Sequence, residues 1–393
     1  MPAAGGDTDP DRVSRQVLRT DVAVVGGGVI GLAVAWRAAR AGLRVALFDE
    51  TPGRGATWAA AGMLAPVTEV HYGEEALLQL NLESARRYPS FVAELEEATE
   101  IDVGYRRSGT LVVARDADDG RAVDDLQAFQ ERLGLSVARL DARACRALEP
   151  ALSPRIRGGL LVQGDHSIDN RALVQGLLVA CARAGIAVLN DRVVALEMSG
   201  DRVQGLRTTS GATACGAVVL ACGCHSGHLE GLPPDALPPV RPVKGQVVHL
   251  RGVLPGPLIE RTIRGLDAYV VPRADGRLVI GATVEEMGFD RRVTAGAVHQ
   301  LLRDAYQLIP GIVEAELTET IAGLRPGSPD NAPLVGPAGP EGLFVASGHY
   351  RNGILLAPVT ADLLTEMLLG APTPAAIAPF SPRRFARSGV TTR

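Results

Sequence analysis

The chain has 393 residues, of which 46% are hydrophobic and 21% charged, so it can bury the core of two domains or of one large discontinuous domain. Its net charge of −4, without a long basic run, gives no indication of nucleic-acid binding. No apolar stretch reaches about eighteen residues, so we expect no transmembrane helix.

Residues 1–18 are polar, mixed in charge and rich in glycine and proline, and they lack the apolar region of a signal peptide. We expect a disordered tail over residues 1–18 and a C-terminal tail over residues 373–393. Five cysteines are an odd set in a large chain, which fits a reducing cytoplasm better than a disulfide framework. We therefore predict a cytoplasmic protein. The spacing Cys222-Gly-Cys224-His225 matches no common zinc site, and we predict no bound metal.

The segment VAVVGGGVIGLAVAWRAARAGLRVALFD, residues 22–49, predicts a complete βαβ unit. An apolar strand ends at the turn GGGVIG, an Ala-rich helix follows, and a second apolar strand ends at Asp49. This is the G-x-G-x-x-G pattern of a dinucleotide-binding turn, with both strands, the helix and the acid at the expected spacing.

Each position of this turn has a physical reason. Gly26 lets the chain turn sharply off the strand, and Gly28 lets a pyrophosphate approach the helix N-terminus, where unpaired N–H groups favour anions. Gly31 lets the helix and the strand pack closely. Asp49 is placed to accept hydrogen bonds from a ribose diol, and this prediction holds for NAD and for FAD alike.

The segment that follows, up to residue 66, is so rich in Gly and Ala that it indicates backbone passing close to a flat ligand. Helices are then predicted at 74–99, 118–133, 142–148 and 171–184, the last capped by Asp169. Strands are predicted at 105–114, 158–163, 187–189, 193–198, 203–208 and 217–221.

The Pro-dense residues 231–242 predict a crossing between domains. Strands are predicted at 245–250, 268–272, 277–281, 318–325 and 343–346, with helices at 295–308 and from the turn SGHYRNGILL to residue 369. A dinucleotide-binding domain assembled from separated segments, with a β-rich domain inserted between them, explains this order. Two consecutive domains would leave the C-terminal GHYRNG turn without a reason.

Four parts of the chain resemble the glutathione-reductase-type flavoproteins of the amino acid oxidase group, and most closely the glycine oxidases of thiamine biosynthesis. These parts are VVGGGVIG (24–31), AAAGML (59–64), VPR-x2-GRLVIGAT (271–283), and AGLRPGSPDNAPLVG (322–336) with SGHYRNGILLAP (347–358). The resemblance implies an α/β fold in which a discontinuous Rossmann-type FAD-binding domain carries an inserted antiparallel β-rich substrate domain with helices. The expected FAD-binding segments are 19–88, 150–238 and 320–372, and the expected substrate-binding segments are 89–149 and 239–319.

The cofactor that the resemblance implies is FAD. Many N-methyl amino acid oxidases tether the flavin through a Cys in the C-terminal half, but no cysteine follows Cys224 here, so we expect non-covalent FAD. The implied contacts are Gly26, Gly28, Val29, Ile30 and Gly31 for the pyrophosphate, Asp49 and Glu50 for the ribose, Ala56, Thr57, Ala61, Gly62 and Met63 for the diphosphate and flavin, and the Val193 main chain for the adenine. Residues His349, Tyr350, Arg351, Asn352, Gly353, Ile354 and Leu355 are expected to open a helix whose N-terminus faces the flavin and stabilises negative charge on it.

The resemblance also implies the catalytic and substrate-binding residues. Arg325, in AGLRPG, matches the arginine that grips the substrate carboxylate, where a bidentate pair fixes orientation. Tyr269, in AYVVPR, matches a tyrosine near the carboxylate, and Arg351, in HYRNG, matches a residue that contacts the substrate. The alternative interpretations are a surface ion pair for the arginines and half-buried packing for the tyrosine. Val284 and Asp267 replace a methionine and a histidine of a well-known member, which puts substrate preference in doubt.

The implied reaction is oxidative deamination of glycine and other small amino acids, such as sarcosine and small D-amino acids. Hydride passes from Cα to flavin N5, O2 is reduced to H2O2, and the imine gives glyoxylate and ammonia or enters thiazole synthesis. The implied partners are thiazole synthase pathway proteins and other copies of the chain, as a homotetramer. The alternatives are a D-amino acid dehydrogenase that passes electrons to a quinone, a sarcosine or N-methyl amino acid oxidase, and an NAD-binding module or redox-inactive flavin scaffold.

Overall fold

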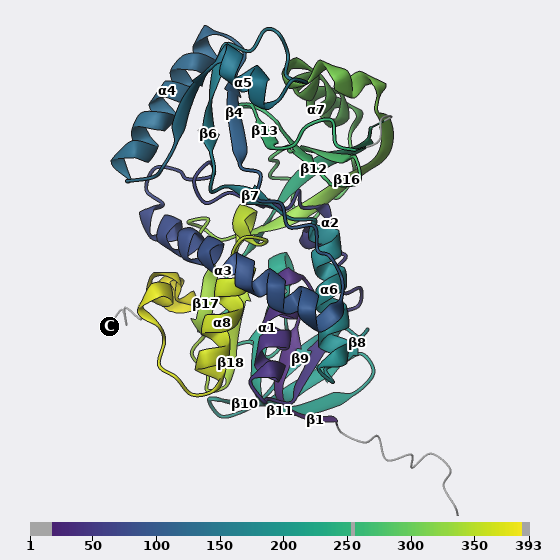
Figure 1. Ribbon diagram of the computed structural model, residues 1–393. Helices are drawn as coiled ribbons and strands as arrows, with labels where there is room; N and C mark the ends of the chain where they lie inside the picture. Colours follow the sequence, from purple (N-terminus) through teal and green to yellow (C-terminus); the bar gives the residue numbers. More distant parts are fainter. Residues whose placement is uncertain (1–17, 253–255, 387–393) are drawn as a thin grey trace, which may run out of the picture.

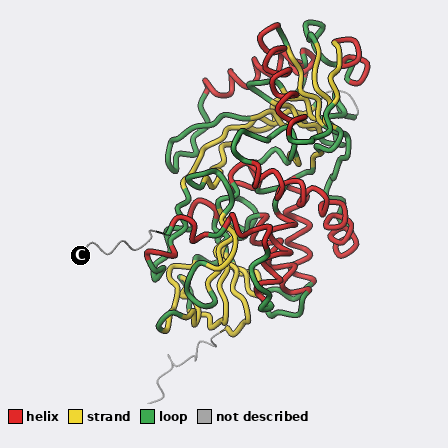
Figure 2. Tube along the Cα trace, turned by 90° about the vertical axis from the view of Figure 1, so that its left-hand side faces the viewer, coloured by secondary structure: helices red, strands yellow, loops and turns green. Residues whose placement is uncertain are grey.

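The computed structural model describes residues 18–252 and 256–386, and its strands form two eight-stranded sheets. Figure 1 shows the first sheet in the lower half of the molecule and the second sheet in the upper half, and Figure 2 shows the same arrangement from the side. The expected α/β class is confirmed. The expected tail covers residues 1–18, of which residues 1–17 lie outside the described part of the chain and Leu18 begins the first strand. None of the described helices combines the length and apolar composition that crossing a bilayer requires.

The first sheet has the strand order β17-β18-β11-β1-β2-β8, and β1 and its neighbours on both sides run parallel. A hairpin of β9 and β10 pairs antiparallel with β11. The bounds of these strands are β1 (Leu18–Val25), β2 (Val45–Phe48), β8 (Ala187–Leu189), β9 (Val193–Ser199), β10 (Arg202–Thr208), β11 (Ala212–Leu220), β17 (Leu334–Pro337) and β18 (Leu343–Ser347).

Four helices share a hydrophobic core with one face of this sheet. Alternate residues of each buried strand point to opposite faces, so each strand contributes to two cores. Val22 and Val24 of β1 pack with the helices, whereas Ala23 and Val25 pack toward the β9–β10 hairpin. The helices are α1 (Val29–Arg40), α3 (Glu75–Thr99), α6 (Asn170–Arg183) and α8 (Ala357–Leu368). The parallel strands β1, β2 and β11 therefore end at one edge, where ligands of such sheets bind.

The second sheet has the order β16-β12-β15-β14-β13-β4-β6-β5 and is antiparallel except where β13 meets β4. Its bounds are β4 (Thr110–Ala114), β5 (Ala138–Asp141), β6 (Gly158–Val162), β12 (Arg241–Arg251), β13 (Thr262–Arg264), β14 (Tyr269–Pro272), β15 (Arg277–Gly281) and β16 (Glu316–Gly327). Helix α7 (Ala295–Leu308) packs on one face, while Val247, Val271 and Val279 on the other face pack with Ala61 below. The remaining elements are α2 (Ala56–Ala59), α4 (Ala117–Arg132), α5 (Ala142–Leu148), and the short pair β3 (Met63–Leu64) and β7 (His166–Ser167).

The structure departs from the expected segment boundaries in four places. Strand β6, expected with the nucleotide-binding part, pairs with β4 of the second sheet, and all of β16 pairs with β12 in that sheet. Helix α3 runs without a break across the boundary expected at residue 88, because its buried face continues through Phe91 to Leu95. The expected C-terminal tail is packed as far as residue 386, with Ile377 and Phe380 buried in the core of the first sheet.

Candidate active site

A cavity of about 1150 Å³ runs from the carboxyl edge of the first sheet to the near face of the second sheet. This volume is above the range of roughly 300–1,000 Å³ that is usual for small-molecule sites, and it suits a ligand of dinucleotide size. Of the predicted site residues, all line this cavity except two. The exceptions are Gly31, which lies under the glycine turn, and Leu355, which is buried in the core of the first sheet.

The glycine turn forms a cradle at the start of α1. Gly26 has a φ of +108°, and a Cβ there would lie 2.6 Å from the Ala221 carbonyl carbon, so only glycine fits. A Cβ at Gly31 would overlap the Gly26 carbonyl oxygen, which confirms the close packing expected of this position. At Gly28 a Cβ would meet only Thr57 Oγ1, at 3.4 Å, so its open side faces the cavity.

The N-cap residue of α1, Gly28, has no side chain to cap the helix, and of the first N–H groups that of Val29 donates to Thr57 Oγ1 at 3.1 Å. A helix start that faces a cavity, with a glycine as its N-cap residue, favours an anion such as a pyrophosphate.

Asp49 stands at the end of β2, beside this cradle. Its Oδ2 accepts a 2.6 Å hydrogen bond from Gly27 N–H, and its Oδ1 accepts one of 2.7 Å from Thr51 N–H. These two bonds hold the carboxylate at the cavity wall, where Glu50 and Val193 also lie. The expected hydrogen bonds to a ribose remain a prediction, and this geometry places the acceptor for them.

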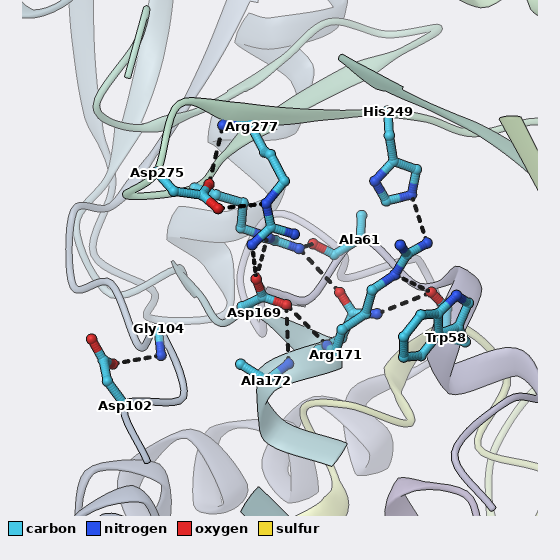
Figure 3. A network of polar contacts seen from close by, with 12 residues as sticks. Trp58, Ala61, Asp102, Gly104, Asp169, Arg171, Ala172, His249, Asp275 and Arg277 are labelled. Atoms are coloured by element: carbon cyan, nitrogen blue, oxygen red, sulfur yellow. Dashed lines mark hydrogen bonds and ion pairs between the residues drawn. The ribbon is translucent and has the colours of Figure 1, made fainter. Parts of the chain in front are cut away.

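The Gly- and Ala-rich stretch after residue 55 is held from both sides, as Figure 3 shows around Ala61 and Trp58. Arg273, nearly fully buried, donates to the Ala61 carbonyl at 2.8 Å, and Asn170 donates to the Thr57 carbonyl at 2.7 Å. Gly62 has a φ of +73°, and a Cβ there would overlap the Ile168 carbonyl oxygen. These contacts fix the backbone of this stretch along the cavity wall. The predicted close approach of a flat ligand would therefore be to a rigid segment.

Asp169 connects this wall to the second sheet. It caps α6 as predicted, accepting from Arg171 N–H at 2.9 Å, and it also accepts from Arg277 at 2.6 Å (Figure 3). Burial alone would raise the pKa of Asp169, but Arg273 and Arg277 hold it below its usual range. Both arginines belong to the VPR-x2-GR segment, so that part of the predicted motif serves to join the two sheets.

Arg325 and Tyr269 meet at the far end of the cavity, on β16 and β14 of the second sheet. The Arg325 guanidinium lies flat on Gly245, since a Cβ there would stand 2.5 Å from both Cζ and Nη2. In the same way the Tyr269 ring lies on Gly281, where a Cβ would stand 2.5 Å from Cζ of the ring. Burial raises the pKa of Tyr269 although Arg325 and Arg264 oppose the shift, so the phenol stays protonated at neutral pH.

The charges at this end leave Arg325 without an acidic partner. Its Nη1 donates to the backbone carbonyls of Thr283, at 3.1 Å, and Lys244, at 3.4 Å, and no carboxylate in the described part of the chain lies within ion-pairing distance. The third predicted substrate residue differs, because the Arg351 guanidinium pairs with the carboxylates of Glu69 and Glu74. The geometry therefore offers a carboxylate-binding group at Arg325.

Two predicted features take another form in the structure. The segment after β18 forms a short 3-10 turn, Tyr350–Asn352, and α8 begins only at Ala357, so the expected helix start lies further along the chain. Here Tyr350 has a φ of +48°, outside helical backbone. His225, in the segment ACGCHS that lacks the family's tryptophan, stacks on Phe289 with ring centroids 4.9 Å apart.

Sequence reasoning missed the acids and one arginine of this end: Glu69, Glu74 and Arg264 all line the cavity. Glu69 and Glu74 lie in the loop before α3, and Arg264 ends the three-residue strand β13. None of them stands in a motif, so the only available signal was the charged loop EVHYGEE that precedes a predicted helix.

Comparisons with known proteins agree with this geometry. The model of the FAD-dependent oxidoreductase family matches residues 21–367. The chain is 37% identical to the glycine oxidase of Geobacillus kaustophilus, over 95% of this chain and 99% of that protein. It is 35% identical to the bifunctional protein ThiO/ThiG of Synechocystis, over 93% of this chain but 54% of that longer protein.

Solved structures show the same fold. The crystal structure of the Geobacillus kaustophilus glycine oxidase superposes with a TM-score of 0.86 at 36% identity, covering 94% of this chain and 99% of that one. The iminodiacetate oxidase of Chelativorans gives a TM-score of 0.83 at 27% identity, covering 92% of this chain and 98% of that one.

Proposed function

Because the chain belongs to the family of FAD-dependent oxidoreductases, we propose that it is a glycine oxidase, which oxidises the amine of glycine and of other small amino acids with O2. The single observation that carries this proposal is the Arg325 guanidinium, which lies at the end of a dinucleotide-sized cavity with no acidic partner among the described residues. A half-buried guanidinium without an acidic partner can bind one carboxylate in a fixed orientation.

The cavity residues fit FAD. We assign the cradle of Gly26, Gly28 and the start of α1 to the pyrophosphate, and Asp49 to the ribose. The stretch from Ala56 to Met63 then lies along the flavin, which fits a backbone fixed by Arg273 and Asn170. When bound, FAD supplies the hydride acceptor and the electrons that reduce O2 to H2O2.

The residues of the chain position the substrate rather than react with it. We assign the substrate carboxylate to Arg325, with the protonated Tyr269 hydroxyl as a further donor to it. The amine must be neutral, so that its lone pair assists loss of hydride from Cα. His349 supplies no base, because it is buried against Thr360, 3.0 Å away, and burial lowers its pKa to about 3.

We extend the proposal to location and partners. The Synechocystis relative is named as a bifunctional ThiO/ThiG protein, and this chain matches 54% of it. This supports a partner protein, encoded apart from this chain, that takes the imine product into thiazole assembly. We place the enzyme in the cytoplasm, where its five free cysteines stay reduced, and we propose a homo-oligomer.

The test is peroxide formation by the purified yellow protein with glycine, sarcosine, D-alanine, D-proline and L-alanine. We expect activity with glycine, and an Arg325→Ala variant that keeps FAD but has a far higher KM. Activity with L-alanine alone, or an unchanged KM for glycine in the variant, would overturn the proposal. Reduction of a quinone-like dye without O2 consumption would indicate the dehydrogenase alternative.

A further inference from the structure

We propose that Glu69 determines how many carboxylates a substrate may carry, because it compensates the one positive charge of Arg264 and Arg351 that Glu74 leaves unpaired, and that charge would otherwise bind a second carboxylate. The inference rests on the proposed function and deepens it. It concerns a cluster at the substrate end of the cavity, defined by Glu69, Glu74, Arg264 and Arg351, which we call the arginine clasp.

Glu69 bridges the two arginines with its two carboxylate oxygens. Oε1 pairs with Arg264 Nη1, and Oε2 lies 3.4 Å from Arg351 Nε. The three side chains are only partly open to the cavity, with 13% of the Glu69 side chain, 25% of Arg264 and 15% of Arg351 exposed. At such burial an unpaired guanidinium would strongly favour an incoming anion.

The clasp has a balanced charge. Glu74 makes a second ion pair with Arg351, so two acids face two arginines. His71 adds no charge at physiological pH, since partial burial and Arg351 lower its pKa. Asp267, also at the cavity wall, is paired with Arg115 at 2.7 Å. Of the three arginines Arg264, Arg325 and Arg351, Arg325 is thus the one left for a substrate, and it accounts for one carboxylate.

The loop that carries Glu69 is fixed, so the acid cannot easily swing away from the arginines. The buried carboxylate of Asp165 accepts from Val67 N–H at 3.0 Å and from Thr68 N–H at 2.7 Å, and Gln130 donates to the Val67 carbonyl at 3.0 Å. Arg351 Nη2 also donates to the backbone carbonyl of Glu69 at 3.2 Å. Removing the negative charge of Glu69 therefore leaves Arg264 in place without its acid, while Arg351 keeps Glu74.

The experiment compares glycine with iminodiacetate, which is also an amine but carries two carboxylates. In Glu69→Gln, which keeps the shape of the side chain, we expect the ratio of kcat/KM for iminodiacetate to that for glycine to rise at least about tenfold over wild type. Glu69→Gln combined with Arg264→Leu should lose most of that gain. Glu83→Gln, which removes a carboxylate on the outer side of α3 paired with Arg87, is the matched control and should leave the ratio unchanged.

Binding of malonate and acetate, followed by flavin absorbance without turnover, gives a second readout. Glu69→Gln should bind malonate at least about tenfold more tightly than wild type, with little change for acetate. If Glu69→Gln does not retain FAD, Glu74→Gln should shift the same ratio in the same direction by less. An unchanged ratio, or a gain that survives loss of Arg264, would overturn the inference. A wild-type protein that does not oxidise glycine overturns the proposed function instead, and the malonate readout still tests the clasp.

Discussion

Replacing Gly245 by alanine should displace the substrate anchor without touching the cofactor motif. A Cβ at this position in β12 would stand 2.5 Å from Cζ and Nη2 of Arg325, closer than real Cβ atoms approach. The crowded atoms are the far end of a flexible side chain, so we expect the guanidinium to move. It then loses the 3.1 Å hydrogen bond that it donates to the Thr283 carbonyl in the wild-type protein. Hydrogen bonds to a charged group are worth about 1.5–3 kcal/mol each, so losing one to the substrate carboxylate raises KM about 10- to 150-fold.

The assay measures kcat and KM for glycine by peroxide formation, with FAD content from absorbance and thermal stability as checks on folding. We expect a raised KM, a kcat close to wild type and full FAD content, which is the signature of lost ground-state binding. Gly296→Ala in α7 is the control, because a Cβ there meets nothing within 4 Å. A folded Gly245→Ala variant whose KM for glycine stays within about twofold of wild type would refute the reasoning.

Three further predictions test other parts of the molecule. Asp49→Ala removes the carboxylate that accepts from Gly27 N–H at 2.6 Å and that we assign to the ribose. The Kd for FAD, measured by flavin fluorescence, should therefore rise about tenfold or more, and an unchanged Kd would contradict the ribose role. Burial raises the pKa of Asp165 from 3.8 to about 6, so ionising this group destabilises the folded protein. Its contribution to the free energy of unfolding is complete below about pH 4, and up to about 3 kcal/mol is lost as the pH rises to about 6 and above. Asp165→Asn should flatten the unfolding free energy across that window, and an identical slope would show that another group titrates. The pKa of Cys222 is raised to about 12 and that of Cys215 to about 11, both by desolvation, so at pH 8 a disulfide reagent should react slowly with these thiols in the native protein, whereas all five thiols should react after denaturation. Fast reaction of either thiol in the native protein would contradict these raised pKa values.

The fold could be predicted where local pattern decides it. The βαβ unit over residues 22–49 has its strands, turn and helix within one short stretch, and the structure places β1, α1 and β2 there. Strand β6 shows the limit of this reasoning. Its sequence GGLLV predicts a buried strand but carries no sign of its partner, and its pairing with β4 depends on contacts about fifty residues away. The short strands β5, β13 and β17 were missed, since three or four residues show no clear period.

The candidate site divides in the same way. Arg325 and Tyr269 could be found because they stand in extended motifs, and the glycine turn because its spacing follows from backbone geometry. The charged residues that surround them in the cavity could not be found. Arg264 and Glu69 are 195 positions apart and meet only because β13 and the loop before α3 reach the same end of the cavity. Whether an arginine is free or paired is therefore a property of the fold, and it decides the role of the residue.

This distinction explains how the site can select a substrate with so few groups. Arg325 comes from the second sheet, whereas the clasp joins Arg264 of that same sheet to Glu69 and Arg351, which come from segments that flank the first sheet, so the clasp forms only where the two parts of the fold meet. An uncompensated charge is costly away from water, and a second one beside Arg325 would attract any dianion small enough to enter. Because the fold places acids against Arg264 and Arg351 and none within ion-pairing distance of Arg325 among the described residues, the positions of the acids, rather than the number of arginines, set which amino acids fit.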